Sequence, residues 1–520
     1  MWATQEGSSH LSGLEEAVLK NIEACKQLSQ MTRTSLGPQG LNKMVLNHLD
    51  KLFVTSDAAT ILEQLEVHHP AAKILAMGVQ AQQSDHGDGT NLLVSVGGEL
   101  LSQASDLLKD GLHPSEVVDG YQKASNLLLS ELSNLCLPSS QQLDLTSEVD
   151  VSKRVKGVIA AKQYGVEDVV APLVVRACSA VTLTDPEKPS EGNFQVDNVR
   201  VAKLSGSGIE QSEVVQGLLL RRDTEGTVKH VKDGKVAVYA TAVDTQTTET
   251  KGTVLLHNAD ELESYSRGEE RKMEEHISAI AQTGAKVVVG NSNFGELALH
   301  FIERYGMMAI KVPSKFELRR FCRAVGATQI VQLQQPQDDE LGYVSSLDVQ
   351  EIGGHKCTVV RQKDAHSQIA TIVLRGATEN VIDDVERAVD DGVNAFRTAC
   401  RDPRLLPAGG ATELALSRKL REEAKRESGL EQYAIDKFAE ALEIIPRVIA
   451  ENSGLNSTDT LSNLHAAHAS GNSAAGVDIE GDAQVKDLSG DGIFDLHGTK
   501  SSAMQLLVDA ACTVLRVVRF

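Results

Sequence analysis

The stretch SDHGDGTNLLVSVGGEL, residues 84–100, joins a polar turn to an apolar segment with the character of a helix. Gly87 and Gly89 allow backbone N–H groups to approach a phosphate closely, and the carboxylate between them, Asp88, is the kind of ligand that holds Mg²⁺. A tight polar turn is the alternative interpretation of the same residues. The stretch therefore predicts either a phosphate-binding loop or a simple turn in front of a helix.

Upstream of this stretch, the sequence predicts a helix over residues 14–31 that ends before the glycine–proline turn LGPQG, residues 36–40. A short extended segment, residues 52–55, then leads to Asp57 at the start of another helical run. Aspartate is a good N-cap residue, so Asp57 fits either a helix cap or a functional carboxylate. The apolar side of the first helix is expected to contain Leu14, Val18, Ile22, Cys25, Leu28 and Met31.

The middle of the chain alternates expected strands with helices, which is typical of an α/β unit. The charge-dense segment 258–280 predicts a helix with a solvated face or, alternatively, a mobile lid or docking element. Residues 357–361 and 368–375 predict a hairpin. The other expected strands are 235–240, 285–289, 307–312 and 327–331, and the expected helices between them are 294–305 and 315–325.

A long helix is predicted from Glu379 onward. Its polar side contains Asp391, at a position where aspartate is ordinarily a solvated surface residue. Further along the chain, Gly409 and Gly410 precede a helix that starts near Ala411, and they predict either a phosphate cradle at a helix N-terminus or a turn. The apolar stripe of the long helix is expected to contain Ile382, Val385, Val389, Val393 and Phe396, with Asp384 and Arg387 opposite.

The composition excludes several classes of protein. A net charge of −21 argues against a surface that neutralises nucleic-acid phosphates, and 10 Phe, 7 Tyr and 1 Trp in 520 residues make base-stacking platforms improbable. The seven cysteines form no CxxC pair, which indicates reduced thiols in a cytoplasmic protein rather than a disulfide framework or a zinc site. We find neither a secretory signal nor an apolar run of membrane-spanning length, so no membrane or nucleic-acid partner is expected.

The order of the motifs along the chain is more specific than any one of them. After LGPQG come SDAATIL at 56–62 and GDGT at 87–90, followed by RGATENVIDDVERAVDDGVNAF at 375–396 and LPAGGATE at 406–413. This order resembles the group II chaperonins, the ring chaperonins of archaea and of the eukaryotic cytosol. Within that family it is similar to one subunit type of the eukaryotic TRiC/CCT complex, and the resemblance covers essentially the whole chain.

The resemblance implies an α/β multidomain chaperonin fold in three parts. A mostly helical equatorial domain would comprise residues 1–140 and 404–520, and an α/β intermediate hinge domain would comprise 141–210 and 360–403. Residues 211–359 would form an α/β apical domain with a helical protrusion at about 245–280. Apical contacts with client proteins are expected from the helix 294–305 and the segment 313–316, through Asn293, Glu296, His300 and Glu303.

The resemblance also implies a site for ATP and Mg²⁺. Asp57 and Asp391 would be the catalytic carboxylates that position the attacking water, Lys162 would sense the γ-phosphate, and Asp88 would bind Mg²⁺. The first phosphate loop would contain Ser35, Leu36, Gly37 and Pro38, and the second Gly87, Asp88, Gly89, Thr90 and Asn91. The nucleoside would contact Gly409, Gly410, Asp478 and Asp495, with the base beside residues 477–479.

Two functions remain open at this level. The first is an ATP-hydrolysing subunit of a double ring of eight-membered hetero-oligomeric rings, which folds clients such as actin and tubulin and works with a prefoldin-type co-chaperone. The second is a structural, client-contacting ring subunit that hydrolyses ATP weakly or not at all. Ala58 and Ala408 replace glycines of the family pattern, which favours the second, whereas the three retained carboxylates Asp57, Asp88 and Asp391 favour the first. An archaeal homo-oligomer is disfavoured by the eukaryotic-type segments and the cysteines.

Overall fold

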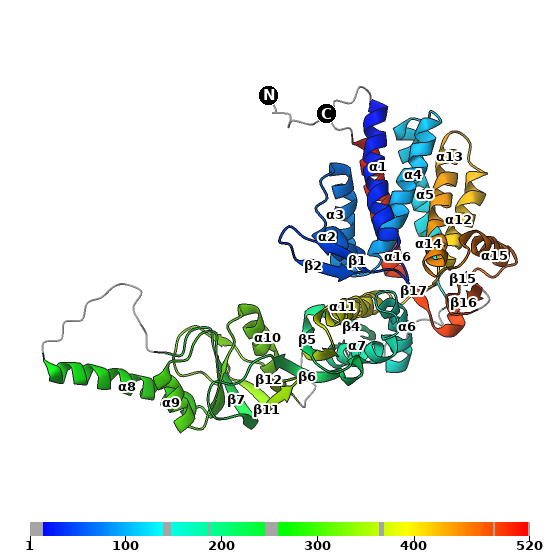
Figure 1. Ribbon diagram of the computed structural model, residues 1–520. Coiled ribbons are helices and arrows are strands. Elements are labelled where there is room, and N and C mark those ends of the chain that lie inside the picture. The colour runs from blue at the N-terminus through cyan, green and yellow to red at the C-terminus, as the bar shows by residue number, and fades with distance from the viewer. Residues whose placement is uncertain are drawn as a thin grey trace, which may run out of the picture. The chain divides into compact units, whose positions relative to one another are not determined.

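The computed structural model describes residues 14–138, 147–185, 188–244, 258–362, 369–481 and 484–517. The chain forms two compact units, each assembled from segments that are distant in sequence (Figure 1). Unit 1 comprises Met1–Val175, Thr184–Asn193 and Asp383–Phe520, and unit 2 comprises Arg176–Leu183 and Phe194–Ile382. Within the described ranges, no helix is both long and apolar enough to cross a membrane.

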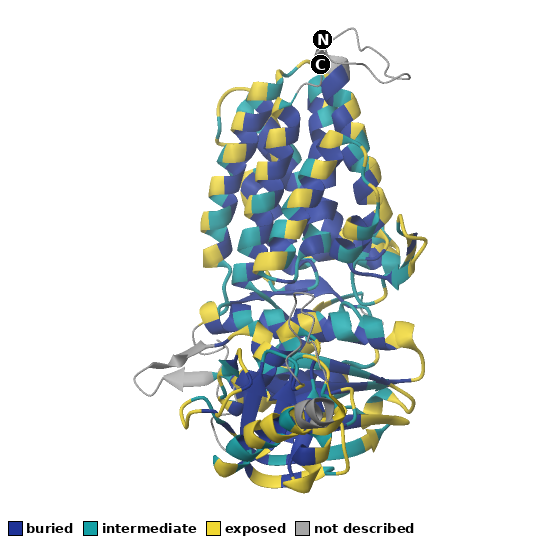
Figure 2. Cartoon of the chain, turned by 90° about the vertical axis from the view of Figure 1, so that its left-hand side faces the viewer, coloured by how far each residue is buried: buried dark blue, intermediate teal, exposed yellow. Residues whose placement is uncertain are grey.

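Long helices dominate unit 1, and the two ends of the chain share its core. α1 (Leu14–Arg33) packs along α4 (Thr90–Lys109), and α16 (His497–Arg516) packs against α4 and α5 (Pro114–Asn134). Figure 2 shows that the buried residues of these helices face one another and leave the exposed ones outside. Four further helices complete the bundle: α3 (Pro70–Asp85), α12 (Ala411–Ala424), α13 (Glu431–Leu442) and α14 (Ile444–Asn452).

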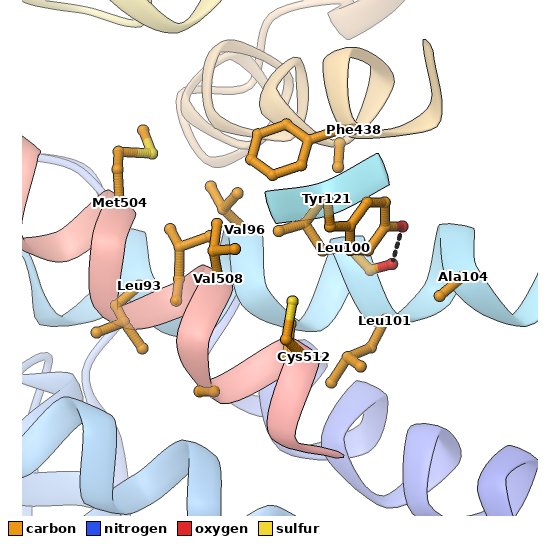
Figure 3. Packing of buried hydrophobic residues seen from close by; sticks show 14 of the residues in the cluster. Leu93, Val96, Leu100, Leu101, Ala104, Tyr121, Phe438, Met504, Val508 and Cys512 are labelled. Atoms are coloured by element: carbon orange, nitrogen blue, oxygen red, sulfur yellow. Dashed lines mark hydrogen bonds between the residues drawn. The ribbon is translucent and has the colours of Figure 1, made fainter. Parts of the chain in front are cut away.

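Aliphatic side chains fill this core around two aromatic rings (Figure 3). The edge of Tyr121 meets the ring of Phe438, with centroids 5.6 Å apart at an interplanar angle of 83°. The Tyr121 hydroxyl donates a 2.9 Å hydrogen bond to the carbonyl of Leu100, so this buried polar group is satisfied. The helix predicted from residue 14 is confirmed, but Met31 is 48% exposed and does not belong to its buried side.

Short strands and helices lie at the ends of the bundle helices. The hairpin of β1 (Lys43–Leu46) and β2 (Leu52–Thr55) leads directly into α2 (Ala58–Gln64). β14 (Leu405–Pro407) pairs with β17 (Phe494–Leu496), which brings together two segments far apart in the sequence. The remaining small elements are β15 (Ala475–Val477), paired with β16 (Val485–Asp487), α15 (Ser457–Ala469) and the 3₁₀ turn η4 (Leu488–Asp491).

Three further helices, α6 (Glu148–Ala160), α7 (Glu167–Val181) and α11 (Glu379–Arg401), precede or follow the sheet segments in the chain. The apolar stripe predicted for α11 is confirmed, since each of its five members is at most 2% exposed. The expectation of a solvated Asp391 is wrong, because this residue is also only 2% exposed. A short hairpin, β3 (Leu183–Asp185) with β4 (Lys188–Asn193), follows α7.

Unit 2 is built on a mixed sheet with the strand order β5-β13-β6-β12-β11-β7-β8-β9, and β10 also pairs with β7. Alternate residues of the parallel strands enter two separate cores, one with α10 (Lys315–Val325) and one with α8 (Ala259–Gln282) and α9 (Glu296–Arg304). The helices therefore cover opposite faces of the sheet. The strands are β5 (Val199–Ser205), β6 (Glu213–Leu220), β7 (His230–Tyr239), β8 (Ala285–Gly290), β9 (Met308–Lys311), β10 (Gln329–Ile330), β11 (Gly342–Ile352), β12 (His355–Arg361) and β13 (Ala370–Gly376). Two 3₁₀ turns flank β5, η2 (Val196–Asn198) and η3 (Ile209–Gln211).

The predicted hairpin of β12 and β13 is wrong, because β6 lies between these strands and pairs with both. The hairpin partner of β12 is β11, and Gly353 and Gly354 supply the two positive φ angles of the connecting turn. The strand expected at 327–331 shortens to two residues. The α/β multidomain class predicted from the sequence is confirmed, with one mostly helical unit and one unit built on a sheet.

The charge-dense segment is the helix α8, and it is anchored more firmly than its composition suggests. Met273, Ile277 and Ile280 are each at most 2% exposed and belong to the core shared with α9. The C-terminal part of this segment therefore packs in the core, and a mobile lid stays a prediction for the residues before Met273. Residues 245–257, the first part of the expected protrusion, lie outside the described residues.

Candidate functional site

The two glycine-bearing loops of the N-terminal segment are tied together. Asn91 donates hydrogen bonds to the carbonyl of Thr32 (3.3 Å) and to the hydroxyl of Ser35 (3.2 Å). From another part of unit 1, the amide of Asn452 donates to the carbonyl oxygens of Arg33 and Leu36. These bonds fix the loop 35–38, in which Gly37 has a φ of +86°, against the start of α4.

The loop 87–90 has left-handed backbone at both of its glycines, which is compatible with the predicted phosphate-binding loop. Gly87 and Gly89 have φ angles of +69° and +77°, and a Cβ atom at Gly87 would overlap the side chain of Asn394. Gly89 is the N-cap of α4 and provides no side-chain cap, so this helix begins with N–H groups open to a ligand. Asp88 accepts a 2.6 Å hydrogen bond from the N–H of Gly89.

Asp57, Lys162 and Asp391 form a buried charged cluster. The Nζ atom of Lys162 lies 2.5 Å from Oδ1 of Asp57 and 3.1 Å from Oδ2 of Asp391. The other oxygen of Asp57 accepts bonds from the N–H and hydroxyl of Thr60, so Asp57 is also the N-cap of α2. The cap and the functional carboxylate are thus compatible roles of one side chain, because each oxygen has its own partner.

The pKa values of the carboxyl groups in this cluster shift in opposite directions. Burial alone would raise the pKa of Asp57, but the Lys162 ammonium and the Thr60 hydrogen bonds lower it to about 2. Burial raises the pKa of Asp391 well above its usual range, because Lys162 offsets the desolvation only partly and Asp57 and Asp88 repel a second negative charge. Burial likewise raises the pKa of Asp88, against the attraction of Lys162. The ammonium of Lys162 therefore acts to lower the pKa of all three carboxyl groups, Asp57, Asp88 and Asp391.

The residues expected at the nucleoside lie around the β14–β17 pair. Asp495 lies opposite Leu406 in that pair, and Gly409 and Gly410 follow β14 with φ angles of +65° and +81°. Gly410 is the N-cap of α12 and gives it no side-chain cap. Asp478 accepts hydrogen bonds from the N–H groups of residues 480 and 481, so its carboxylate holds its own turn together.

These residues fit a nucleotide with Mg²⁺. Mg²⁺ commonly takes one or two protein carboxylates together with substrate phosphates and water, which matches Asp88 beside a glycine cradle. Across the described part of the chain, no group of three or more His, Cys, Asp or Glu residues could hold a metal by itself. The buried Oδ2 of Asp391 makes no hydrogen bond despite its ion pair, which leaves it able to accept one from a ligand.

Sequence reasoning missed several side chains that shape the site. Gln82 donates to the carbonyl of Asp88, and Asn452 holds the first loop. Glu413 and Lys500 form a buried ion pair next to Asp495. Glu413 stands only three residues after Gly410 and could have been suspected, whereas no local pattern marks the other three.

The chain is similar to known proteins over almost its whole length. The family model described as "TCP-1/cpn60 chaperonin family" matches residues 28–518. The chain is 50% identical to the T-complex protein 1 subunit theta of Arabidopsis thaliana over 513 residues, which are 99% of this chain and 92% of the relative. It is 47% identical to the theta subunits of Dictyostelium discoideum, covering 99% and 94% of the two chains, and of Homo sapiens, covering 99% and 92%.

The resemblance inferred from the motif order is thereby confirmed, including its eukaryotic subunit type, which is theta. The matched region contains both glycine-bearing loops and the three clustered side chains. The family model and the sequence relatives lead to the same assignment. The chain belongs to the TCP-1/cpn60 chaperonin family.

Proposed function

We propose that this chain is an ATP-hydrolysing subunit of a hetero-oligomeric chaperonin, built as a double ring of eight-membered rings in the cytosol. The observation that carries the proposal is the cluster of Asp57, Lys162 and Asp391, which is buried in unit 1 together with two glycine-lined helix N-termini. Such a cluster is costly to bury for structural reasons alone. Family membership supplies the nucleotide, ATP.

Each group has a part in hydrolysis. The N–H groups at the start of α4 and the loop 35–38 would bind phosphate oxygens, and Asp88 would hold Mg²⁺, which neutralises phosphate charge when bound. Asp57 and Asp391 would orient the attacking water. A carboxylate whose pKa is raised by burial is a stronger base, so Asp391 is the better proton acceptor of the two. Lys162 keeps Asp57 ionised and would attract the γ-phosphate.

The proposed partners follow from the family. They are the other subunits of the ring, client polypeptides such as actin and tubulin, and a prefoldin-type co-chaperone. Asn293, Glu296 and His300 are exposed on or beside α9 and remain candidates for client contact. Glu303 is less suited, because its carboxylate accepts a 2.8 Å hydrogen bond from the N–H of Thr227.

A weakly hydrolysing structural subunit is the second candidate function. The argument for it is that Ala58 and Ala408 replace glycines of the family pattern. Ala58 is the first residue of α2, and neither alanine has a positive φ. A methyl group is compatible with both backbones, so these substitutions give no reason for slow hydrolysis.

Two measurements test the proposal. Native mass spectrometry of the particle that contains this chain should show a hetero-oligomer of two eight-membered rings, and a homo-oligomer would contradict the assembly. Single-turnover hydrolysis should be measurable in particles whose other subunits are all inactivated. Nucleotide binding without hydrolysis in those particles would support the structural subunit instead.

A further inference from the structure

A buried lysine outside the phosphate region connects two carboxylates on different elements. The Nζ atom of Lys500, on the first turn of α16, lies 2.6 Å from Oε1 of Glu413 on α12 and 2.7 Å from Oδ2 of Asp495 on β17. The side chains of Lys500 and Glu413 are 7% and 0% exposed, whereas that of Asp495 is 38% exposed. The ion pairs therefore run from the interior to the surface.

Glu413 and Asp495 differ in how far burial removes their carboxylates from water. Glu413 is completely buried, and neither of its oxygens makes a hydrogen bond, so only the ion pair with Lys500 offsets its desolvation. Asp495 is half-exposed, and water could solvate it without help. Because Glu413 keeps Lys500 in place, Lys500 in turn holds one oxygen of Asp495. The ion pair with Lys500 uses Oδ2, so the other oxygen, Oδ1, can accept a hydrogen bond from a ligand.

The position of Asp495 gives this arrangement a use. Asp495 pairs with Leu406, which stands shortly before Gly409 and Gly410 at the open N-terminus of α12. A carboxylate that is fixed through one oxygen and open at the other is a directed acceptor for a hydroxyl group. A side chain that instead rotates freely would lose rotamer entropy on every binding event.

We propose that Lys500 is a positioning residue that fixes Asp495 as the acceptor for a ribose hydroxyl, and that Glu413 anchors this lysine. The proposal rests on the proposed nucleotide-binding function and adds the origin of its preference for a ribonucleotide. Lys500 itself touches no ligand in this account. Its effect is to hold the Asp495 carboxylate in one orientation through Oδ2.

The test compares ribonucleotide with deoxyribonucleotide binding. The full-length chain, in the assembly in which it purifies, is photolabelled with 8-azido-ATP, and mass spectrometry assigns the label to this chain. ATP, 2′-deoxy-ATP and 3′-deoxy-ATP then compete with the label. The parent should bind at least one deoxy analogue roughly 10-fold more weakly than ATP, the scale of one hydrogen bond to a charged group.

Lys500→Met alone would leave Glu413 buried without a counter-ion and could prevent folding. The informative variant is therefore Lys500→Met with Glu413→Gln, and Glu413→Gln alone is its matched control. The control should retain the preference for ATP, and the double variant should lose it. Asp495→Asn, which leaves Lys500 and Glu413 paired, should lose it to the same extent.

The outcomes are distinct. Equal weakening of all three nucleotides in the double variant, with the preference retained, would mean that Lys500 is only structural and would overturn the inference. A parent that binds ATP and both deoxy analogues equally would overturn it while leaving the proposed function intact. If 8-azido-ATP does not label the parent at all, the result would contradict the proposed nucleotide-binding function and also the inference that rests on it.

Discussion

Lys162 and Asp391 lie with Nζ and Oδ2 3.1 Å apart, and their side chains are only 12% and 3% exposed. Lys162 follows the end of α6, and Asp391 stands in the middle of α11. The same ammonium is also 2.5 Å from Asp57, so two carboxyl groups share one cation. An incoming ligand that binds Lys162 or a carboxylate would therefore change the charge state of the whole cluster.

The opposite pKa shifts of the two carboxylates give a test by pH. The pKa of Asp57 is lowered to about 2, so its charge stabilises the folded state above pH 4 and loses this effect as the pH falls toward 2. Asp57→Asn keeps an N-cap acceptor but removes the charge, and at pH 7 it should cost about 2 kcal/mol. The measurement is the urea midpoint of parent and variant between pH 7 and pH 3.

The difference between parent and Asp57→Asn should be constant above pH 5 and should narrow below pH 4. Asp57→Ala serves as a control, because loss of the cap adds about 1 kcal/mol that does not depend on pH. A difference that stays unchanged down to pH 3 would show that the ion pair with Lys162 contributes nothing to stability.

The alanines that replace family glycines should be neutral for turnover. Neither Ala58 nor Ala408 has a positive φ, so Ala408→Gly removes no strain. We expect Ala408→Gly to leave the rate of single-turnover hydrolysis within about twofold of the parent, because the backbone at residue 408 has no strain that a glycine would relieve. Gly87→Ala is the matched contrast, because it adds a methyl group at a φ of +69° against Asn394 and should abolish hydrolysis. A large rate increase in Ala408→Gly would contradict the structure.

Asp88 should determine the affinity for the metal complex of the nucleotide. Asp88→Ala should weaken binding of Mg-ATP about 10-fold or more, since the carboxylate beside the cradle is lost, and should change binding of metal-free ATP much less. Asp85→Ala, an exposed aspartate three residues earlier, is the control and should behave as the parent. Calorimetry with and without EDTA separates the two cases. Equal loss of both affinities in Asp88→Ala would indicate a damaged loop rather than a lost metal ligand.

The helix α8 should show two levels of hydrogen-exchange protection. Its C-terminal part should exchange slowly with or without nucleotide, because Met273, Ile277 and Ile280 are buried in the core. Residues 267–272 are exposed or half-exposed and should exchange faster. In the presence of a mimic of the hydrolysis transition state, slower exchange confined to residues 267–272 would support a lid that gains contacts on closure. Rapid exchange at Ile277 without nucleotide would contradict the observed packing.

The local geometry of the candidate site could be predicted from the sequence where it depends on neighbouring residues. Gly87 and Gly89 flank Asp88 in three consecutive residues, so the two positive φ angles of this loop follow from a short stretch of sequence. The burial of Asp391 could not be predicted this way. Periodicity places it opposite an apolar stripe, and only the tertiary structure brings Lys162 from another segment to cover it.

The same limit applies to the fold. The apolar stripe of α11 was predictable because its spacing is that of one helix face. The hairpin expected from β12 and β13 failed because strand pairing is not a local property, and β6, from more than 130 residues earlier in the chain, lies between them. Lys500 and Glu413 meet for the same reason, through the pairing of β14 with β17.

The central claim is that the cluster around Lys162 hydrolyses ATP, and one comparison tests it most directly. Single-turnover hydrolysis is measured in particles in which this chain is the only active subunit, with the parent, Asp391→Ala and the control Asp390→Ala, an exposed neighbour on α11. Asp391→Ala should bind ATP nearly as the parent does and hydrolyse it about 100-fold more slowly or worse, since a positioned base is lost, whereas Asp390→Ala should match the parent. Hydrolysis by Asp391→Ala at the parent's rate would contradict the account.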